Sequence, residues 1–246
     1  MTRKIPSSKE IKLAWDSYHS LDDFELLYPE PILIGFFKYI FNSTNALDKM
    51  LDLGCGSGQV YSLCKEYFNL ILGVDYSSNA IKRCKEKCSN FKGIELDLMV
   101  EKEYKKILDS YSFKNSIITA FQILDHIPKD CTFNLLKYLV KGEAKFVLIS
   151  LFTESCQGNS IKGEFNEKNN TYFSPISINK ENLFEMHSFY SYSEIQMIIE
   201  IFKQSNYQLK KSTQSTIKYI DPNSMQKDKV NTFEQMETIY LLFAHI

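Results

Sequence analysis

The sequence lacks a long hydrophobic run and lacks a clear excess of charge of either sign. No apolar stretch reaches the about 18 residues that cross a bilayer, and the start, MTRKIPSSKE, has no apolar segment of the kind that a signal peptide carries. With 29 basic and 30 acidic residues among 246, the formal net charge is −1. Nucleic-acid-binding domains are usually clearly basic. We therefore expect a cytoplasmic protein with no membrane partner and no nucleic-acid partner.

Metal-binding cysteine patterns are also missing. The chain has six cysteines, with no CxxC pair and no histidine at zinc-finger spacing. Cys84 and Cys88 lie one helical turn apart and would make half of a metal site, but without a second half we interpret them as small residues on a helix face. In a cytoplasmic protein the cysteines are expected to stay reduced, and no metal is expected.

Short β-branched runs alternate with longer amphipathic stretches from about residue 48, which predicts a parallel sheet covered by helices. The chain length fits one doubly wound α/β domain with a modest addition. The predicted strands are residues 49–53, 70–75, 92–96, 116–121 and 145–151. The predicted helices between them are residues 59–68, 78–88, 102–110 and 129–140.

The segments before and after this alternating region have different sequence patterns. Residues 8–41 are predicted to be helical, with a break at Pro29-Glu30-Pro31, and we expect residues 1–45 to form an N-terminal helical lid on a domain of residues 46–246. Residues 152–190 are rich in Asn, Ser, Gly and Lys, which predicts an irregular insertion that caps the substrate side. A last helix at residues 192–203 precedes strands at 208–220 and 237–244, which lie too close together for a crossover helix and should pair antiparallel.

Glycine is scarce, yet three of the nine glycines lie in the segment Gly54-Cys55-Gly56-Ser57-Gly58, directly after the first predicted strand. Glycine is needed where the backbone takes positive φ or approaches a ligand, and a strand-to-helix turn at the carboxyl edge of a parallel sheet is where doubly wound folds bind ligands. A plain turn without a ligand needs one glycine and not three. No Gly-Lys-Ser/Thr follows, which argues against a nucleotide triphosphate. The spacing is GxGxG and not the dinucleotide GxGxxG, which weakens the case for NAD.

Two acids follow at strand ends. Asp75 ends the second predicted strand, where a carboxylate can accept hydrogen bonds from both ribose hydroxyls of an adenosine, as in either NAD or S-adenosylmethionine. Asp97 ends the third, where it would meet an adenine amino group. The alternative for Asp97 is a cap for the following helix.

Four segments together resemble the successive cofactor motifs of class I S-adenosylmethionine-dependent methyltransferases. They are LDLGCGSG (51–58), GVDYS (73–77), ELDL (95–98) and ITAFQILDHIP (118–128). The likeness covers residues 48–150. It implies a Rossmann-like methyltransferase fold with a seven-stranded, mostly parallel sheet and a reversed final strand, and S-adenosylmethionine as the cofactor.

The resemblance also implies roles for single residues. Gly54 and Gly56 would lie against the methionine part of the cofactor, and Asp75 would bind the ribose. Tyr76 would pack on adenine, Asp97 and Leu98 would meet its polar edge, and the Phe121 carbonyl would face the methionine ammonium. The other expected cofactor contacts are Asp52, Cys55, Gly58 and Tyr28. Tyr28 belongs to a Tyr-Pro segment that precedes the first motif in a broad group of small-molecule methyltransferases, whose pattern also includes residues 185–189.

The acceptor is expected to be a small molecule with a hydroxyl. Enzymes that methylate base amino groups usually place Asn/Asp-Pro-Pro-Tyr/Phe after the fourth strand, whereas this chain has residues 122–126, QILDH. Methyl transfer is an in-line displacement that needs a held nucleophile and, for a hydroxyl, a base. His126 lies at the expected edge, and the unperturbed pKa of histidine, about 6.5, suits proton removal at neutral pH, although the residue can also merely shape the pocket. His187 is the second candidate base if residues 152–190 fold over the site.

Two other functions remain open at this stage. The motifs indicate cofactor binding and not chemistry, so a regulatory protein that binds S-adenosylmethionine without turnover has the same signature. An NAD-dependent oxidoreductase is the other alternative, because a strand-end acid such as Asp75 binds either adenosine.

Overall fold

The computed structural model describes residues 7–20, 30–156, 164–166, 171–178, 181–220 and 233–246. Five parallel strands begin the main sheet, as the alternation of segments predicts. They are β1 (Lys49–Leu53), β2 (Leu70–Asp75), β3 (Phe91–Glu95), β4 (Ser116–Ala120) and β5 (Phe146–Phe152). The complete order is β3-β2-β1-β4-β5-β10-β9. The chain therefore reverses its direction of travel across the sheet between β1 and β4, and ligands bind at such switch points.

The last two strands confirm the expected reversal. β9 (Tyr207–Ile220) and β10 (Phe233–His245) pair antiparallel, and β10 also pairs antiparallel with β5, so it inserts between β5 and β9. The antiparallel pairing agrees with the prediction that was made from the close spacing of the two strands.

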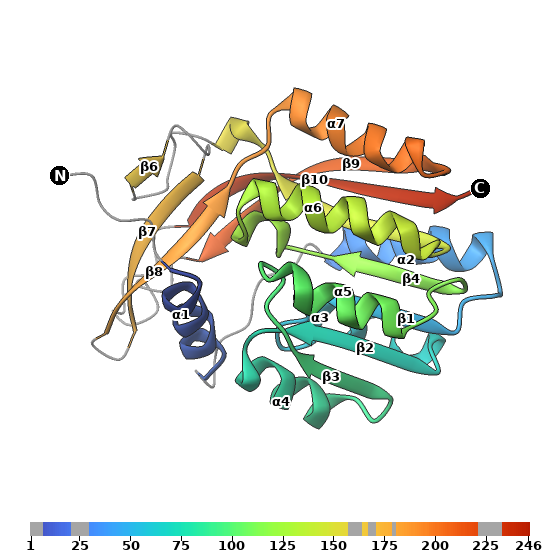
Figure 1. Cartoon of the computed structure of the whole chain (residues 1–246), viewed down its shortest axis with the longest axis horizontal. Coiled ribbons are helices and arrows are strands. Elements are labelled where there is room, and N and C mark those ends of the chain that lie inside the picture. Colours follow the sequence, from blue (N-terminus) through green and yellow to red (C-terminus); the bar gives the residue numbers. More distant parts are fainter. Residues whose placement is uncertain (1–6, 21–29, 157–163, 167–170, 179–180, 221–232) are drawn as a thin grey trace.

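Helices cover both faces of the sheet (Figure 1). α2 (Glu30–Ser43), α3 (Gln59–Ser62) and α4 (Ser78–Lys87) share one apolar core with one face of the strands. α5 (Glu101–Ser110), α6 (Lys129–Leu139) and α7 (Tyr192–Gln204) share the other. Strands β4 and β5 are buried along their whole length, as expected for central strands packed on both faces. Among the described residues, no helix is both long and apolar enough to cross a membrane.

The predicted helix over residues 59–68 is wrong in length. The structure has only α3, followed by a 3-10 turn at Lys65–Tyr67. Val60, Tyr61 and Cys64 are all buried, and the Tyr61 hydroxyl donates to the Cys84 carbonyl at 3.0 Å. The helix ends where Tyr61 bonds to α4 and Cys64 lies 3.7 Å from the sulfur of Met50 on β1, and local helical periodicity does not encode such tertiary contacts.

Residues 152–190 are not the irregular segment that their composition predicts. β6 (Glu164–Asn166), β7 (Thr171–Ile178) and β8 (Glu181–Ser188) form a separate antiparallel sheet in the order β6-β7-β8. Asn, Ser and Pro are poor strand formers by propensity, but strand stability depends largely on pairing and packing with neighbours. Here β7 pairs with β8, and both contact α1 (Ser8–Ser20).

The second sheet and α1 lie at the carboxyl ends of the parallel strands, on the left in Figure 1. The N-terminal segment is helical in α1 and α2, as predicted, while residues 21–29 lie outside the described part of the chain. Glu30 and Pro31, which were expected to break the helix, instead begin α2, because proline is tolerated in the first turn. This arrangement places α1, β8 and the loop after β4 around one end of the sheet. The candidate site is formed there.

Candidate functional site

The glycine turn between β1 and α3 is held against β2 by its backbone. The N–H groups of Gly54 and Cys55 both donate to the Val74 carbonyl, at 2.7 and 3.0 Å. Gly54, Gly56 and Gly58 all have positive φ, of 66°, 49° and 88°. Within this turn, glycine therefore occupies each of the three positions where an L side chain would be strained.

The glycines differ in what they face. A β-carbon on Gly58 would lie 2.0 Å from the Tyr61 ring, so Gly58 is required by packing within the turn. Gly54 likewise packs against Ile123. Gly56 borders a cavity, and a β-carbon there would come within 3.4 Å of the His19 ring. Gly56 is therefore the glycine whose missing side chain keeps open space beside the turn.

Asp75 connects this turn to the end of β2. Its Oδ2 accepts from the Gly56 N–H at 3.0 Å and its Oδ1 accepts from the Ser77 N–H at 2.9 Å. A carboxylate offers about four lone-pair positions, so both oxygens can still accept from a ligand. Asp75 lines the same cavity as Gly56. This geometry fits a pair of ribose hydroxyls.

Helix α1 is fastened across the carboxyl edge by polar contacts. Asp16 Oδ1 accepts from the Ser77 hydroxyl at 2.7 Å and from the Asn79 N–H at 3.3 Å, so its carboxylate lies at the N-terminus of α4, where negative charge is favourable. Lys12 forms an ion pair with Glu95 at 2.6 Å. These contacts hold the face of α1 that carries Trp15 and His19 over the end of the sheet.

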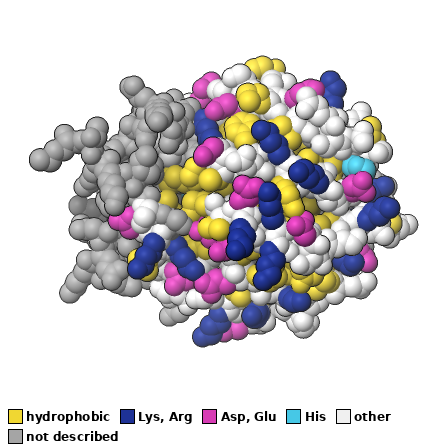
Figure 2. Space-filling model, in the orientation of Figure 1, with side chains coloured by type: hydrophobic (Ala, Val, Ile, Leu, Met, Phe, Trp, Pro, Cys, Tyr) yellow, Lys and Arg dark blue, Asp and Glu magenta, His cyan; other side chains and the backbone are white. Residues whose placement is uncertain are grey.

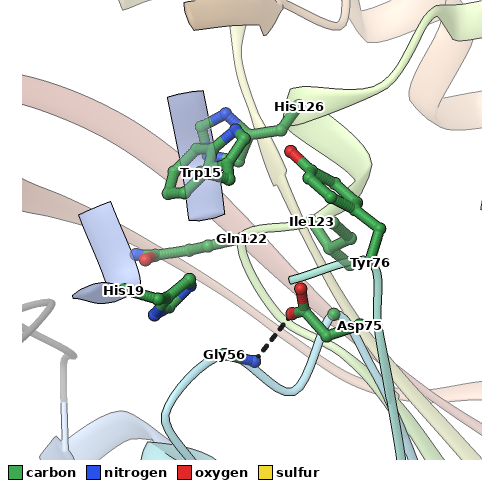
Figure 3. A pocket seen from close by; sticks show the side chains of 9 residues that line it. Trp15, His19, Gly56, Asp75, Tyr76, Gln122, Ile123 and His126 are labelled. Carbon is green, nitrogen blue, oxygen red and sulfur yellow. Dashed lines mark hydrogen bonds between the residues drawn. The ribbon is translucent and has the colours of Figure 1, made fainter. Parts of the chain in front are cut away.

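The cavity between α1 and the sheet brings together residues from four separate segments (Figure 3). Its lining residues are Trp15, His19, Gly54, Gly56, Asp75, Tyr76, Gln122, Ile123 and His126. In Figure 3, Gly56 and Asp75 lie at one end, and Trp15 and His126 lie at the other. Five residues that the sequence singles out are thus placed around one cavity: Gly54, Gly56, Asp75, Tyr76 and His126.

The remaining expected cofactor contacts do not line this cavity. Cys55, Gly58, Leu98 and Phe121 are buried behind it, in the turn or in the core. Asp97 is half-buried, and its Oδ1 accepts from the Met99 N–H at 2.8 Å in the turn before α5. It is not the cap of that helix, because the N-cap position is Val100, with no side-chain hydrogen bond. Tyr28 lies outside the described residues.

Asp52 is buried at the end of β1 with one oxygen in use. The Thr119 hydroxyl donates to Oδ1 at 2.7 Å, whereas Oδ2 has no hydrogen-bond partner within the described part of the chain. Burial raises the pKa of Asp52 to about 7, opposed by the Thr119 hydrogen bond and reinforced by the charge of Asp75. A buried carboxylate oxygen without a partner is suited to a cationic ligand, because an ammonium group would restore the lost hydrogen bond and charge balance.

His126 ends the 3-10 turn Leu124–His126 after β4, and its position is fixed by β8. Its Nδ1 lies 3.0 Å from the Met186 carbonyl, an acceptor, so Nδ1 carries the hydrogen of the neutral ring and the lone pair is on Nε2. The Trp15 ring lies edge-on at 4.6 Å between centroids. β8 also places His187 5.0 Å from His126, between ring centroids, although His187 does not line the cavity. His187 therefore lies beside His126 without bordering the cavity.

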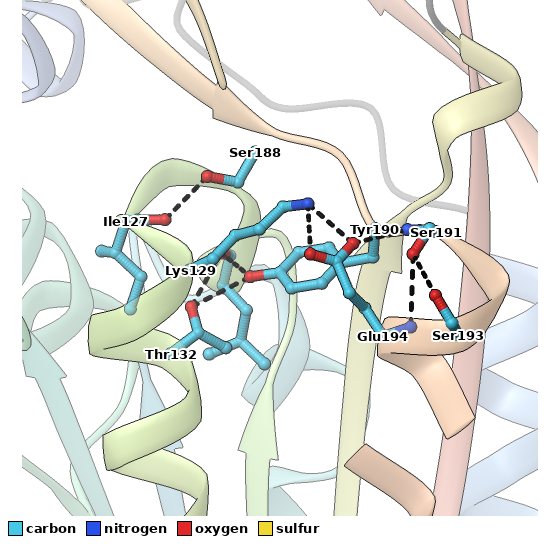
Figure 4. A network of polar contacts seen from close by, with 9 residues as sticks. Ile127, Lys129, Thr132, Ser188, Tyr190, Ser191, Ser193 and Glu194 are labelled. Atoms are coloured by element: carbon cyan, nitrogen blue, oxygen red, sulfur yellow. Dashed lines mark hydrogen bonds and ion pairs between the residues drawn. The ribbon is translucent and has the colours of Figure 1, made fainter. Parts of the chain in front are cut away.

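A network of hydrogen bonds fastens the loop that carries His126 (Figure 4). The Tyr190 hydroxyl donates to the Leu124 carbonyl at 2.9 Å, and the Ser188 hydroxyl donates to the Ile127 carbonyl at 2.9 Å. On the other side, Asp125 is fully buried and accepts from the Phe152 N–H at 2.6 Å. Burial raises the pKa of this Asp125 carboxyl well above its usual range. The loop is therefore held from three directions, which fixes the imidazole in one orientation.

Sequence reasoning missed Trp15, His19, Gln122 and Ile123 as cavity residues. Gln122 and Ile123 follow β4 directly, so their position at the carboxyl edge was a usable signal. Trp15 and His19 had none, because only the docking of α1 through Asp16 brings them to the site. No helical pattern within residues 8–20 specifies where the helix docks.

Comparison with known proteins gives one family and one fold. A family model described as a methyltransferase domain matches residues 44–220. A SAM-dependent methyltransferase from Anabaena variabilis has 12% identity and a TM-score of 0.66, with 99% of this chain and 96% of that chain covered. The CcbJ methyltransferase from Streptomyces caelestis has 10% identity and a TM-score of 0.63, with 96% and 99% covered.

A third similar structure is magnesium protoporphyrin IX methyltransferase from Synechocystis with bound SAM. It has 10% identity and a TM-score of 0.58, with 99% of this chain and 100% of that chain covered. No curated protein sequence matches the chain. At such low identities the likeness establishes the fold, and the acceptor must be argued from the site.

Proposed function

The chain belongs to the class I S-adenosylmethionine-dependent methyltransferases, and from this we propose that it methylates a hydroxyl group of a small-molecule acceptor. S-adenosylmethionine is the cofactor. The observation that carries the proposal is the position of His126 at the end of the cavity away from Gly56, with Nδ1 on the Met186 carbonyl, so that the neutral form of the ring would have its lone pair on Nε2.

The cofactor would be held by the residues around the glycine turn. Asp75 would accept from the ribose hydroxyls, and Tyr76, which is buried beside it, would pack on adenine. Gly54 and Gly56 would lie against the methionine part, and the Asp52 carboxylate would balance its ammonium. Cys55, Gly58, Asp97, Leu98, Phe121 and Tyr28 remain proposed as further contacts or supports.

When bound, S-adenosylmethionine supplies a methyl group on a sulfonium, a leaving group that needs no protonation. The protein then has to orient an acceptor and remove its proton. His126 would take the hydroxyl proton on Nε2, while the Met186 carbonyl, which accepts from Nδ1, stabilises the imidazolium that forms. Trp15 would form an apolar wall beside the reacting oxygen and exclude water.

His187 is the alternative base on the other side of His126. It is buried, and it touches His126 and Phe152 through its ring. For His187 to act, the acceptor would have to reach past His126. The cavity reaches His126 first, and this ranks His126 above His187.

A small acceptor fits the way in which the site is covered. We propose residues 1–45 as a helical lid and residues 152–190 as the substrate-side insertion of a domain spanning residues 46–246, because α1 and β8 both close on the loop after β4. We propose no nucleic-acid partner, because the formal net charge is −1 and the Lys and Arg side chains on the face shown in Figure 2 are interspersed with Asp and Glu.

The proposal is tested by a transfer screen with methyl-labelled S-adenosylmethionine. Matched sets of small alcohols, phenols, amines and carboxylic acids are incubated with the protein, and labelled product is counted. We expect label in hydroxyl compounds, because a hydroxyl must lose its proton as it attacks and His126 lines the cavity as a candidate base. Label in amines alone would contradict the O-methyl assignment. Binding of S-adenosylhomocysteine without transfer to any class would favour a regulatory protein.

A further inference from the structure

His19 on α1 lies directly over the glycine turn. The ring is buried, and its Nδ1 is 3.1 Å from the Ser57 hydroxyl. A β-carbon added to Gly56 would meet His19 Cε1 at 3.4 Å and Nε2 at 3.9 Å. Figure 3 shows His19 and Gln122 on one side of the cavity and Asp75 on the other, with Gly56 below them. His19 therefore faces the part of the cavity that the backbone of the turn borders.

The proposed ligand requires both a negative and a positive protein group at this end of the cavity. The methionine part of the cofactor carries an ammonium and a carboxylate. Asp75 lines the cavity and Asp52 is buried behind the turn, so acids for the cation are present. Of the residues that line the cavity, only His19 and His126 can carry positive charge, and His126 lies at the far end.

We infer that His19 binds the carboxylate of the methionine part of S-adenosylmethionine. The inference rests on the proposed placement of the cofactor against Gly54 and Gly56. It adds to the cofactor site a side chain from outside the matched segments, and it gives α1 a second role besides covering the site. Nδ1 of the imidazole contacts the Ser57 hydroxyl, and Nε2 lies beside the space over Gly56. Nε2 would therefore bind the carboxylate while Nδ1 keeps its contact with the turn.

Binding should then be coupled to a proton. Burial is the largest effect on His19 and lowers its pKa. The negative charges of Asp75 on β2 and Asp16 on α1 raise this pKa, and the positive charge of Arg83 on α4 lowers it. The free protein therefore holds a neutral ring at neutral pH, and a carboxylate placed against the ring raises its pKa. Proton uptake makes the carboxylate ligand bind more tightly as pH falls. Asp52 has a pKa of about 7. If its carboxylate pairs with the ammonium, protonation of Asp52 weakens binding as pH falls, which is opposite to the effect of His19.

Two ligands separate the carboxylate from the adenosine. S-adenosylhomocysteine has the amino-acid part, and 5′-methylthioadenosine lacks it. His19→Phe keeps an aromatic ring beside Trp15 and removes both nitrogens. By calorimetry at pH 7, we expect His19→Phe to weaken S-adenosylhomocysteine about 5- to 30-fold and to change 5′-methylthioadenosine by less than about twofold. The control variant His245→Phe, on β10 and outside the cavity, should change both affinities by less than about twofold.

The pH dependence of binding gives a second readout. The effect of Asp52 on binding is present in both wild type and His19→Phe, so it cancels in the ratio of their dissociation constants. The ratio of the two dissociation constants for S-adenosylhomocysteine, His19→Phe over wild type, should grow as pH is lowered from 8 to 6. An equal loss for both ligands, no loss for either, or a ratio that is flat or shrinks would overturn the inference. Wild-type protein that binds neither ligand would instead contradict the cofactor site itself.

Discussion

The variant His126→Gln should lower kcat by about 10²–10⁴ with an acceptor found in the transfer screen, while its affinity for S-adenosylhomocysteine stays within about threefold of wild type. Glutamine has a similar reach and can still donate to the Met186 carbonyl, but it cannot take a proton. Steady-state kinetics over pH 5–9 provide the measurement. The wild-type rate should rise with pH and level off once the ring is neutral, and the residual rate of the variant should lack that rise.

His187→Gln is the control for this substitution, because the two rings lie 5.0 Å apart and share the same aromatic surroundings. We expect His187→Gln to lower kcat by less than about tenfold. If His126→Gln keeps most of the activity, His126 only positions the acceptor. If His187→Gln instead shows the large loss, the base lies on β8, and closure of the second sheet becomes a condition for catalysis.

Replacing Asp75 with alanine should weaken S-adenosylhomocysteine by about 10- to 100-fold, which corresponds to about 1.4–2.7 kcal/mol. The variant loses the acceptor for the ribose hydroxyls and also leaves the N–H groups of Gly56 and Ser77 without their carboxylate. Calorimetric titration gives the dissociation constants, and urea unfolding of the same samples separates lost binding from lost folding. Equal affinities for the variant and the wild type would remove Asp75 from the site.

The central strands and the glycine turn could be predicted because their signals are local. Residues 49–53 and 70–75 were predicted with the bounds that the structure has, since short apolar runs end at the turn and at Asp75. The pairing of β9 with β10 followed from the shortness of their connection. Asp75 and His126 could be placed because strand ends of a parallel sheet meet at one edge.

The second sheet and the position of α1 over the main sheet could not be predicted, because both depend on contacts between distant segments. The composition of β7 and β8 predicts a loop. The two strands form because they pair with each other and pack against α1. The tautomer of His126 depends on a carbonyl 60 residues away, at Met186. His19 reaches Gly56 only because Asp16 docks on Ser77 and Asn79.

The most direct test of the account is calorimetric titration of the wild-type protein with S-adenosylhomocysteine and, separately, with NAD. The account predicts one binding site per chain for S-adenosylhomocysteine, with a micromolar dissociation constant, and no heat of binding for NAD, whose GxGxxG turn this chain lacks. Binding of NAD, or no binding of S-adenosylhomocysteine by the folded protein, would contradict it.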